Sequence, residues 1–121
     1  MSPVSLGRVL LVDDDEELRG AVGAVLQAEG FVVLEARNGL HALQQLMRTP
    51  LPQVILLDMT MPVMTGFEFL EYQSQDPRIR DLPVIAVTAY DKVAAIPGVV
   101  QVVRKPFDLA QLLEVLRSVL A

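Results

Sequence analysis

The chain has 121 residues, enough for one domain with a single core and too few for two. Its formal net charge is -5 and its 10 basic residues are scattered, which argues against a protein that binds a nucleic-acid backbone. It contains no cysteine, no apolar stretch near the ~18–20 residues of a membrane span, and no pattern of an N-terminal secretion signal. We therefore expect an acidic, soluble, cytoplasmic domain with neither a nucleic-acid nor a membrane partner.

Five short apolar runs alternate along the chain with segments of helical periodicity. The runs are Arg8–Val12, Phe31–Ala36, Val54–Leu57, Val84–Val87 and Val99–Val103. Apolar residues recur at helical spacing between several of these runs and most clearly from Leu109 to Leu120. Helix starts are predicted at Asn38, at Asp108 and at Thr65-Gly66-Phe67-Glu68, which has the form of a capping box. The alternation predicts an α/β fold, a (βα)5 doubly wound parallel five-stranded sheet.

The composition of each run indicates where its strand lies in the sheet. All runs except the second are nearly continuous Val, Ile, Leu and Ala, which is typical of strands covered on both faces. The second run, Phe31–Ala36, is more mixed and is predicted at an edge. Between Thr88 and Lys105 only 105 − 88 = 17 positions hold a helix, a turn and the fifth strand. Asp91–Ala95 can form little more than one turn before Pro97-Gly98, so the fourth helix is predicted to be short or absent.

Polar residues follow four of the five runs. They are Asp13–Asp15 after the first run, Asp58 after the third, Thr88 after the fourth and Lys105-Pro106 after the fifth. Taken singly, each has an ordinary explanation: Asp13–Asp15 could cap a helix, and the others could lie in turns or on the surface. The carboxyl ends of parallel strands meet at one edge of a sheet, however, and open α/β sheets bind ligands there. The coincidence favours a functional site.

The residue types at this edge indicate the chemistry of the site. Carboxylates placed as close as Asp13, Asp14 and Asp58 repel one another unless a cation joins them. Oxygen ligands without His or Cys suit a hard divalent cation, of which Mg²⁺ is the expected one. The ammonium of Lys105 and the hydroxyl of Thr88 could then bind phosphate oxygens. Asp58, alone at the end of the central strand, is the candidate nucleophile for an aspartyl-phosphate.

Four segments now identify a known family. They are Val9-Leu10-Leu11-Val12-Asp13-Asp14-Asp15, Asp58-Met59-Thr60-Met61-Pro62-Val63-Met64-Thr65-Gly66, Val87-Thr88-Ala89 and Lys105-Pro106-Phe107. In this order and on these strand ends, they resemble the receiver domain of bacterial two-component response regulators, and the resemblance covers residues 1–121. It implies a flavodoxin-like strand order 2-1-3-4-5. It also implies a signalling switch that catalyses its own phosphorylation and dephosphorylation rather than an enzyme acting on a free substrate.

The resemblance also implies a role for each site residue. Asp58 would accept the phosphoryl group from a sensor histidine kinase or a histidine phosphotransfer protein, and the switch would then act on a downstream protein. Asp13, Asp14, Asp58 and the backbone carbonyl of Thr60 would hold Mg²⁺, with Asp14 the more direct ligand of the acidic pair. Thr88 would bind the phosphoryl group and move toward it. Lys105 would pair with a phosphoryl oxygen, and the bond from Lys105 to Pro106 would be cis.

Two positions depart from the family pattern and affect how the signal would leave the site. The family usually has Tyr or Phe three residues before the lysine, whereas this chain has Val102. The fourth helix, commonly part of the output face, is predicted to be about one turn short. The usual relay through that face is therefore in question. We also hypothesise that the ring of Tyr90 shields the acyl phosphate from water.

Two other functions remain as alternatives. A Mg²⁺-dependent phosphohydrolase of the haloacid dehalogenase type also uses an aspartyl-phosphate, a threonine and a lysine. Such enzymes place the nucleophile in a D-x-D motif after the first strand, whereas Asp58 follows the third. A degenerate receiver that binds partners without phosphate is the other alternative, and the complete acidic set argues against it.

Overall fold

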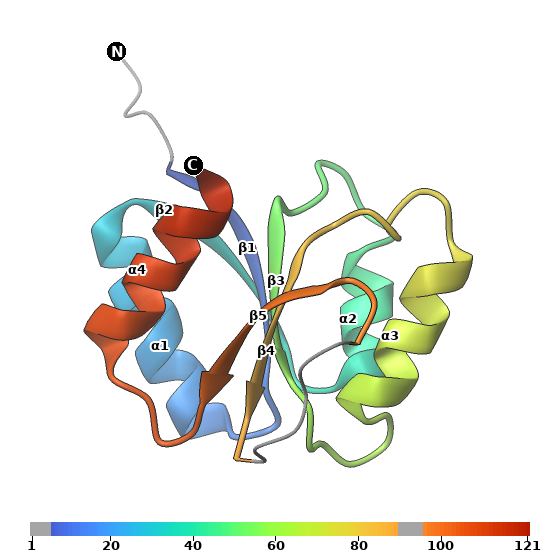
Figure 1. The fold of residues 1–121 in the computed structure, drawn as a ribbon, viewed down its shortest axis with the longest axis horizontal. Coiled ribbons are helices and arrows are strands. Elements are labelled where there is room, and N and C mark those ends of the chain that lie inside the picture. Colours follow the sequence, from blue (N-terminus) through green and yellow to red (C-terminus); the bar gives the residue numbers. More distant parts are fainter. Residues whose placement is uncertain (1–5, 90–95) are drawn as a thin grey trace.

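The computed structural model describes residues 6–89 and 96–121 (Figure 1). Within these residues, strands and helices alternate in chain order as the sequence predicts, except that no helix is described between the fourth and fifth strands. They are β1 (Gly7–Val12), α1 (Glu16–Glu29), β2 (Phe31–Ala36), α2 (Gly39–Gln45), β3 (Val54–Asp58), α3 (Gly66–Gln75), β4 (Val84–Thr88), β5 (Val99–Arg104) and α4 (Leu109–Leu120). None of the helices in the described part of the chain is long and apolar enough to cross a bilayer.

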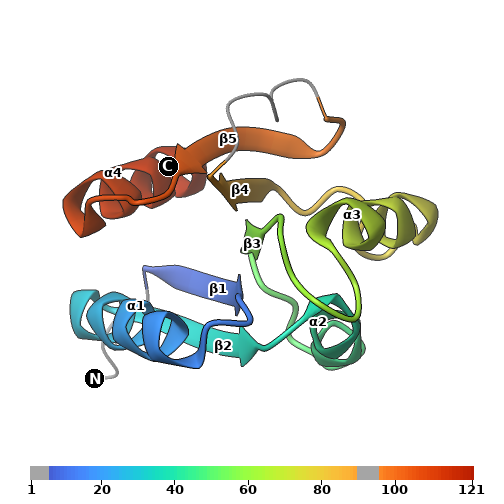
Figure 2. The same ribbon diagram turned by 90° about the horizontal axis from the view of Figure 1, so that it is seen from below.

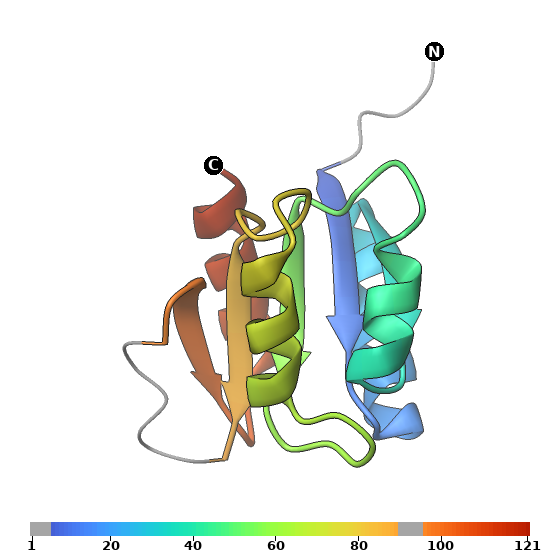
Figure 3. The ribbon, with the colours of Figure 1, turned by 90° about the vertical axis from the view of Figure 1, so that its right-hand side faces the viewer.

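The five strands form one parallel sheet in the order β2-β1-β3-β4-β5, which confirms the predicted fold and strand order. All strands run toward the same end of the molecule (Figure 3). Helices α1 and α4 cover one face of the sheet, and α2 and α3 cover the other (Figure 2). The polar residues at the carboxyl ends of the strands are therefore carried to one edge.

Alternate residues of the central strands supply two apolar cores, one on each face of the sheet. In β1, Leu10 and Val12 belong to one core, whereas Val9 and Leu11 belong to the other. The apolar residues Val9–Val12 of β1 and Val54–Leu57 of β3 are buried on both faces, as a parallel strand requires when helices cover both sides of the sheet. The central strands β1 and β3 are thus held firmly beneath the site.

The two edge strands differ in how well the sequence predicted them. β2 lies at an edge, as its mixed composition indicated. The prediction that the fifth strand is covered on both faces was wrong: β5 forms the opposite edge, and Val100 and Gln101 are exposed. The physical reason is that a run of valines reports a preference for β-structure as well as for burial. The predicted fourth helix at 91–95 and Tyr90 lie outside the described residues.

Side-chain caps fix the start of each helix next to the site. Asp15 caps α1 by accepting a hydrogen bond from the Leu18 amide at 3.0 Å, so one member of the acidic triplet has the ordinary structural role. Thr65 and Glu68 form the predicted reciprocal capping box of α3. Asn38 and Asp108 cap α2 and α4 as predicted, and Asp108 accepts a hydrogen bond from the Ala110 amide.

Candidate phosphoryl-acceptor site at the carboxyl edge of the sheet

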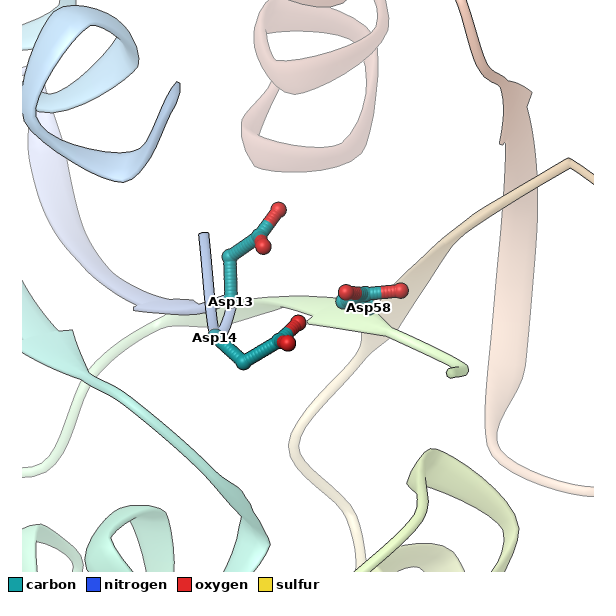
Figure 4. Close-up of side chains that lie close together, drawn as sticks. All are labelled: Asp13, Asp14 and Asp58. Atoms are coloured by element: carbon teal, nitrogen blue, oxygen red, sulfur yellow. The ribbon is translucent and has the colours of Figure 1, made fainter. Parts of the chain in front are cut away.

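Three carboxylates meet where the two central strands end. Asp13 and Asp14 directly follow β1, and Asp58 is the last residue of β3, which pairs with β1. One carboxylate oxygen from each residue lies within 4.8 Å of those of the other two (Figure 4). Asp13 and Asp58 are buried, whereas Asp14 is exposed. The cluster therefore opens to solvent on the side of Asp14.

Lys105 places a positive charge against the two buried carboxylates. Its Nζ lies 3.3 Å from Asp13 Oδ2 and 3.5 Å from Asp58 Oδ2. Its backbone amide donates to the Thr88 carbonyl oxygen at 2.9 Å, which ties the residue after β5 to the end of β4. Burial lowers the pKa of Lys105, but Asp13 and Asp58 raise it by more, so the net shift is upward. The lysine is held as a cation beside Asp58.

The surroundings of Asp58 perturb the pKa of its carboxyl group. Burial raises its pKa from the ordinary 3.8 to about 6, and the negative charge of Asp13 adds to the rise. The Thr60 amide, which donates to Asp58 Oδ1 at 3.0 Å, and the Lys105 ammonium act in the opposite direction. An additional cation at the site would favour the ionised form of this group. A set of three carboxylate oxygens without nitrogen or sulfur fits a hard divalent cation.

The two threonines lie at the same edge. Thr88 is the last residue of β4 and is buried, and the preceding residue, Val87, pairs with Asp58 across the ladder. Thr60 has an exposed side chain, while its backbone amide contacts Asp58. The structure thus brings the proposed acidic residues, Thr60, Thr88 and Lys105 to one edge of the sheet, while the proposed place of Tyr90 lies outside the described residues. The peptide bond from Lys105 to Pro106 is cis.

Sequence reasoning missed one residue beside the site, Arg19 of α1. Its Nη1 donates to the Asp13 carbonyl oxygen at 2.7 Å, and its Nε pairs with Glu35 Oε1 at 3.0 Å. In the sequence, Arg19 is an ordinary polar position on an amphipathic helix, and Glu35 lies 16 residues away in another element. A contact of this kind leaves no local pattern in the sequence.

The family follows from comparison with known proteins. The family model described as the response regulator receiver domain matches residues 9–117. The chain belongs to this family. Its role is accordingly that of a receiver domain, the phosphoacceptor domain of two-component signalling. Domains of this family interact in general with kinases and with downstream targets.

Individual relatives agree with this assignment over nearly the whole chain. The polar-differentiation response regulator DivK of Brucella anthropi is 31% identical, with 93% of this chain and 94% of DivK aligned. The crystallised chemotaxis protein CheY4 of Vibrio cholerae is 32% identical with a TM-score of 0.84, covering 93% of this chain and 97% of that chain. The phosphate regulon transcriptional regulatory protein PhoB of Escherichia coli is 32% identical, but this chain spans only 51% of its length.

Proposed function

We propose that this domain accepts a phosphoryl group on Asp58 in a Mg²⁺-dependent reaction. The observation that carries the proposal is the meeting of the Asp13, Asp14 and Asp58 carboxylates at one strand edge, with the Lys105 ammonium 3.5 Å from Asp58. A nucleophilic carboxylate, a cation-binding pair and a lysine are the parts needed to hold a phosphoryl group in line with an attacking oxygen. Membership of the receiver family supports the same assignment.

The transfer itself asks little covalent chemistry of the protein. An ionised Asp58 oxygen attacks the phosphorus of a phosphohistidine, the O–P bond forms as the N–P bond breaks, and the imidazole leaves. Before the reaction, the Lys105 ammonium pairs with the carboxylates of Asp13 and Asp58. During the transfer it pairs with a phosphoryl oxygen and neutralises part of the negative charge on the phosphoryl group. The Thr88 hydroxyl binds another phosphoryl oxygen. The structural contribution is position and charge.

The acidic pair and Asp58 would hold the metal, with the Thr60 carbonyl as a further ligand. The fit rests on the donor set, which is three carboxylates close enough to share one ion. Bound there, Mg²⁺ would neutralise charge on the phosphoryl oxygens and favour the ionised form of Asp58. Asp14, the exposed member of the pair, would be the more direct ligand of the two.

The proposal extends to partners and location. The phosphoryl donor would be a sensor histidine kinase or a histidine phosphotransfer protein in the cytoplasm, and the phosphorylated domain would act on a downstream protein. Residues 1–121 would form one receiver domain that modifies only itself and turns over no free substrate. The position of Asp58 on β3, rather than after β1, favours this function over an aspartyl-phosphate phosphohydrolase. The complete acidic set favours it over a receiver that works without phosphate.

The route by which the signal leaves the site would differ from the usual one. Val102 pairs with Ala86 in the β4–β5 ladder and packs half-buried against the core beneath α2 and α3. A valine has no ring that could rotate inward when Thr88 moves. The change at Thr88 would therefore reach the surface through the backbone of β4 and β5 rather than through an aromatic rotamer.

Phosphorylation by a small acyl phosphate tests the proposal directly. Incubation of the protein with acetyl phosphate and Mg²⁺ is expected to add one phosphoryl group, detected by intact-mass spectrometry. The adduct is expected to disappear with a chelator and in Asp58→Asn, which removes the nucleophilic carboxylate but keeps an oxygen that can accept from the Thr60 amide. The matched control is Asp81→Asn, an exposed aspartate away from the cluster. No adduct on the parent protein, or an adduct that persists in Asp58→Asn, would contradict the assignment.

A further inference from the structure

We propose that Arg19 is a positioning residue for the cation site, because it fixes the peptide group that joins Asp13 to Asp14. The inference rests on the proposed function, since it concerns the same acidic pair. Arg19 does not belong to the carboxylate cluster and would not touch the bound cation. It acts through the backbone that carries two of the ligands.

One guanidinium links three elements at this point. Arg19 lies in the first turns of α1, and its side chain is only 14% exposed. Its Nη1 donates to the carbonyl oxygen of Asp13 at the end of β1, and its Nε pairs with Glu35 in β2. Both hydrogen bonds carry the charge of the guanidinium, which strengthens them relative to neutral bonds. Arginine suits this position because its planar fork presents several donors in fixed directions.

The bond to the Asp13 carbonyl acts directly on Asp14. A peptide group is planar, so the carbonyl of Asp13 and the amide of Asp14 turn together. Holding the Asp13 oxygen therefore sets the direction in which the chain enters Asp14. Asp14 is exposed, unlike Asp13 and Asp58, and burial does not hold it in place. The Arg19 contact orients the ligand that packing supports least.

Asp13 shows how completely this strand end is fixed. Its amide donates to the Ala36 carbonyl oxygen at 3.1 Å, and its Oδ1 accepts from the Asp15 amide at 2.9 Å. Its Oδ2 pairs with Lys105, and its carbonyl oxygen accepts from Arg19. Every polar atom of Asp13 thus has a partner in a different direction. Two of these four contacts constrain the peptide that follows: the bond from the Asp15 amide to Oδ1, which spans it, and the bond from Arg19, which holds its carbonyl oxygen directly.

Because Arg19 is positively charged, the direction in which its removal changes the Mg²⁺ affinity tests the inference. A positive charge near a cation site repels the cation, so its removal should tighten Mg²⁺ binding if charge were all that mattered. Loss of a group that orients metal ligands instead weakens binding, by about 10–100-fold in typical cases. Arg19→Gln removes the charge and the fork together, so the two roles predict opposite changes in the dissociation constant.

The experiment measures Mg²⁺ affinity by isothermal titration calorimetry in the parent, Arg19→Gln and Arg19→Lys. We expect a dissociation constant about 10-fold higher in Arg19→Gln, with a smaller loss in Arg19→Lys because lysine keeps one charged donor. The matched control is Arg117→Gln, which breaks another arginine–glutamate pair. Arg117 Nη2 lies 3.0 Å from Oε2 of Glu29, the last residue of α1, at the end of the helix away from the site. This control should leave the affinity within about 2-fold of the parent.

A second readout separates positioning from general stability. With acetyl phosphate as donor, Arg19→Gln should need about 10-fold more Mg²⁺ for half-maximal phosphorylation, while the rate at saturating Mg²⁺ stays near that of the parent. A purely structural role would lower the free energy of unfolding in urea and leave the Mg²⁺ requirement of the folded protein unchanged. Unchanged or tighter Mg²⁺ binding in Arg19→Gln would overturn the inference. Failure of the parent itself to bind Mg²⁺ would instead overturn the proposed function, and the role of Arg19 with it.

Discussion

In the metal-free protein, Asp58→Asn is expected to raise the free energy of unfolding by about 2–3 kcal/mol at pH 8 and by only about 0.5 kcal/mol at pH 4. The cause is the burial that lifts the pKa of Asp58 from 3.8 to about 6. Between these values the folded protein binds a proton that the unfolded chain has released, so stability falls as the pH rises. Above pH 6 the full cost of a buried ionised carboxylate is present, and asparagine removes it.

Urea unfolding in the presence of a chelator measures this effect at the two pH values. Asparagine keeps the hydrogen bond from Thr60, and Lys105 keeps Asp13 as a partner, so the substitution leaves no group at the site without one. Asp81→Asn, at an exposed position, should change the free energy of unfolding by less than about 0.5 kcal/mol at both pH values. A stabilisation by Asp58→Asn of the same size at pH 4 and pH 8 would show that ionisation of Asp58 is not its cause.

Gly66→Ala is expected to destabilise the protein by about 2–3 kcal/mol and to impair phosphorylation of Asp58. Gly66 begins α3, and a Cβ atom there would lie 2.7 Å from Met59 Cα and 2.9 Å from the Asp58 carbonyl oxygen. These are backbone atoms, which cannot swing aside as the end of a flexible side chain can. Either α3 or the end of β3 must move, and β3 carries the nucleophile.

Gly20→Ala is the matched control for this substitution. Gly20 lies inside α1, and a Cβ atom there would meet nothing within 4 Å. Alanine favours a helix interior over glycine by about 0.8–1.0 kcal/mol, so this variant should be more stable than the parent. Thermal or urea unfolding measures both variants, and the acetyl phosphate assay measures the effect on Asp58. A stabilised Gly66→Ala variant would contradict the close packing of α3 on the end of β3.

The acidic site was predictable because it depends on strand ends rather than on detailed packing. Asp13, Asp14 and Asp58 directly follow or end apolar runs, and parallel strands bring their carboxyl ends to one edge whatever the packing of the helices. Lys105 follows the same rule at the end of β5. The structure adds the distances and the division of roles, in which Asp15 caps α1 while Asp13 and Asp14 face Asp58.

Other features could not be predicted because they depend on contacts between distant elements. The salt bridge from Arg19 to Glu35 joins α1 to β2, and neither residue stands out in its own segment. The exposure of Val100 and Gln101 in β5 depends on which elements pack against that strand, while its valine-rich composition resembles that of a central strand. The close approach of Gly66 to Met59 appears only when α3 has docked.

The sequence by itself determined the class of fold, the edge of the sheet that carries the site, and the residue types that meet there. It could do so because hydrophobic periodicity and strand ends are local properties, and a parallel sheet converts them into position without further information. Only the tertiary structure decided the pKa of Asp58, the exposure of β5 and the support that Arg19 gives to the Asp13–Asp14 peptide. Burial and contacts between separate elements set these properties, and both exist only in the folded chain.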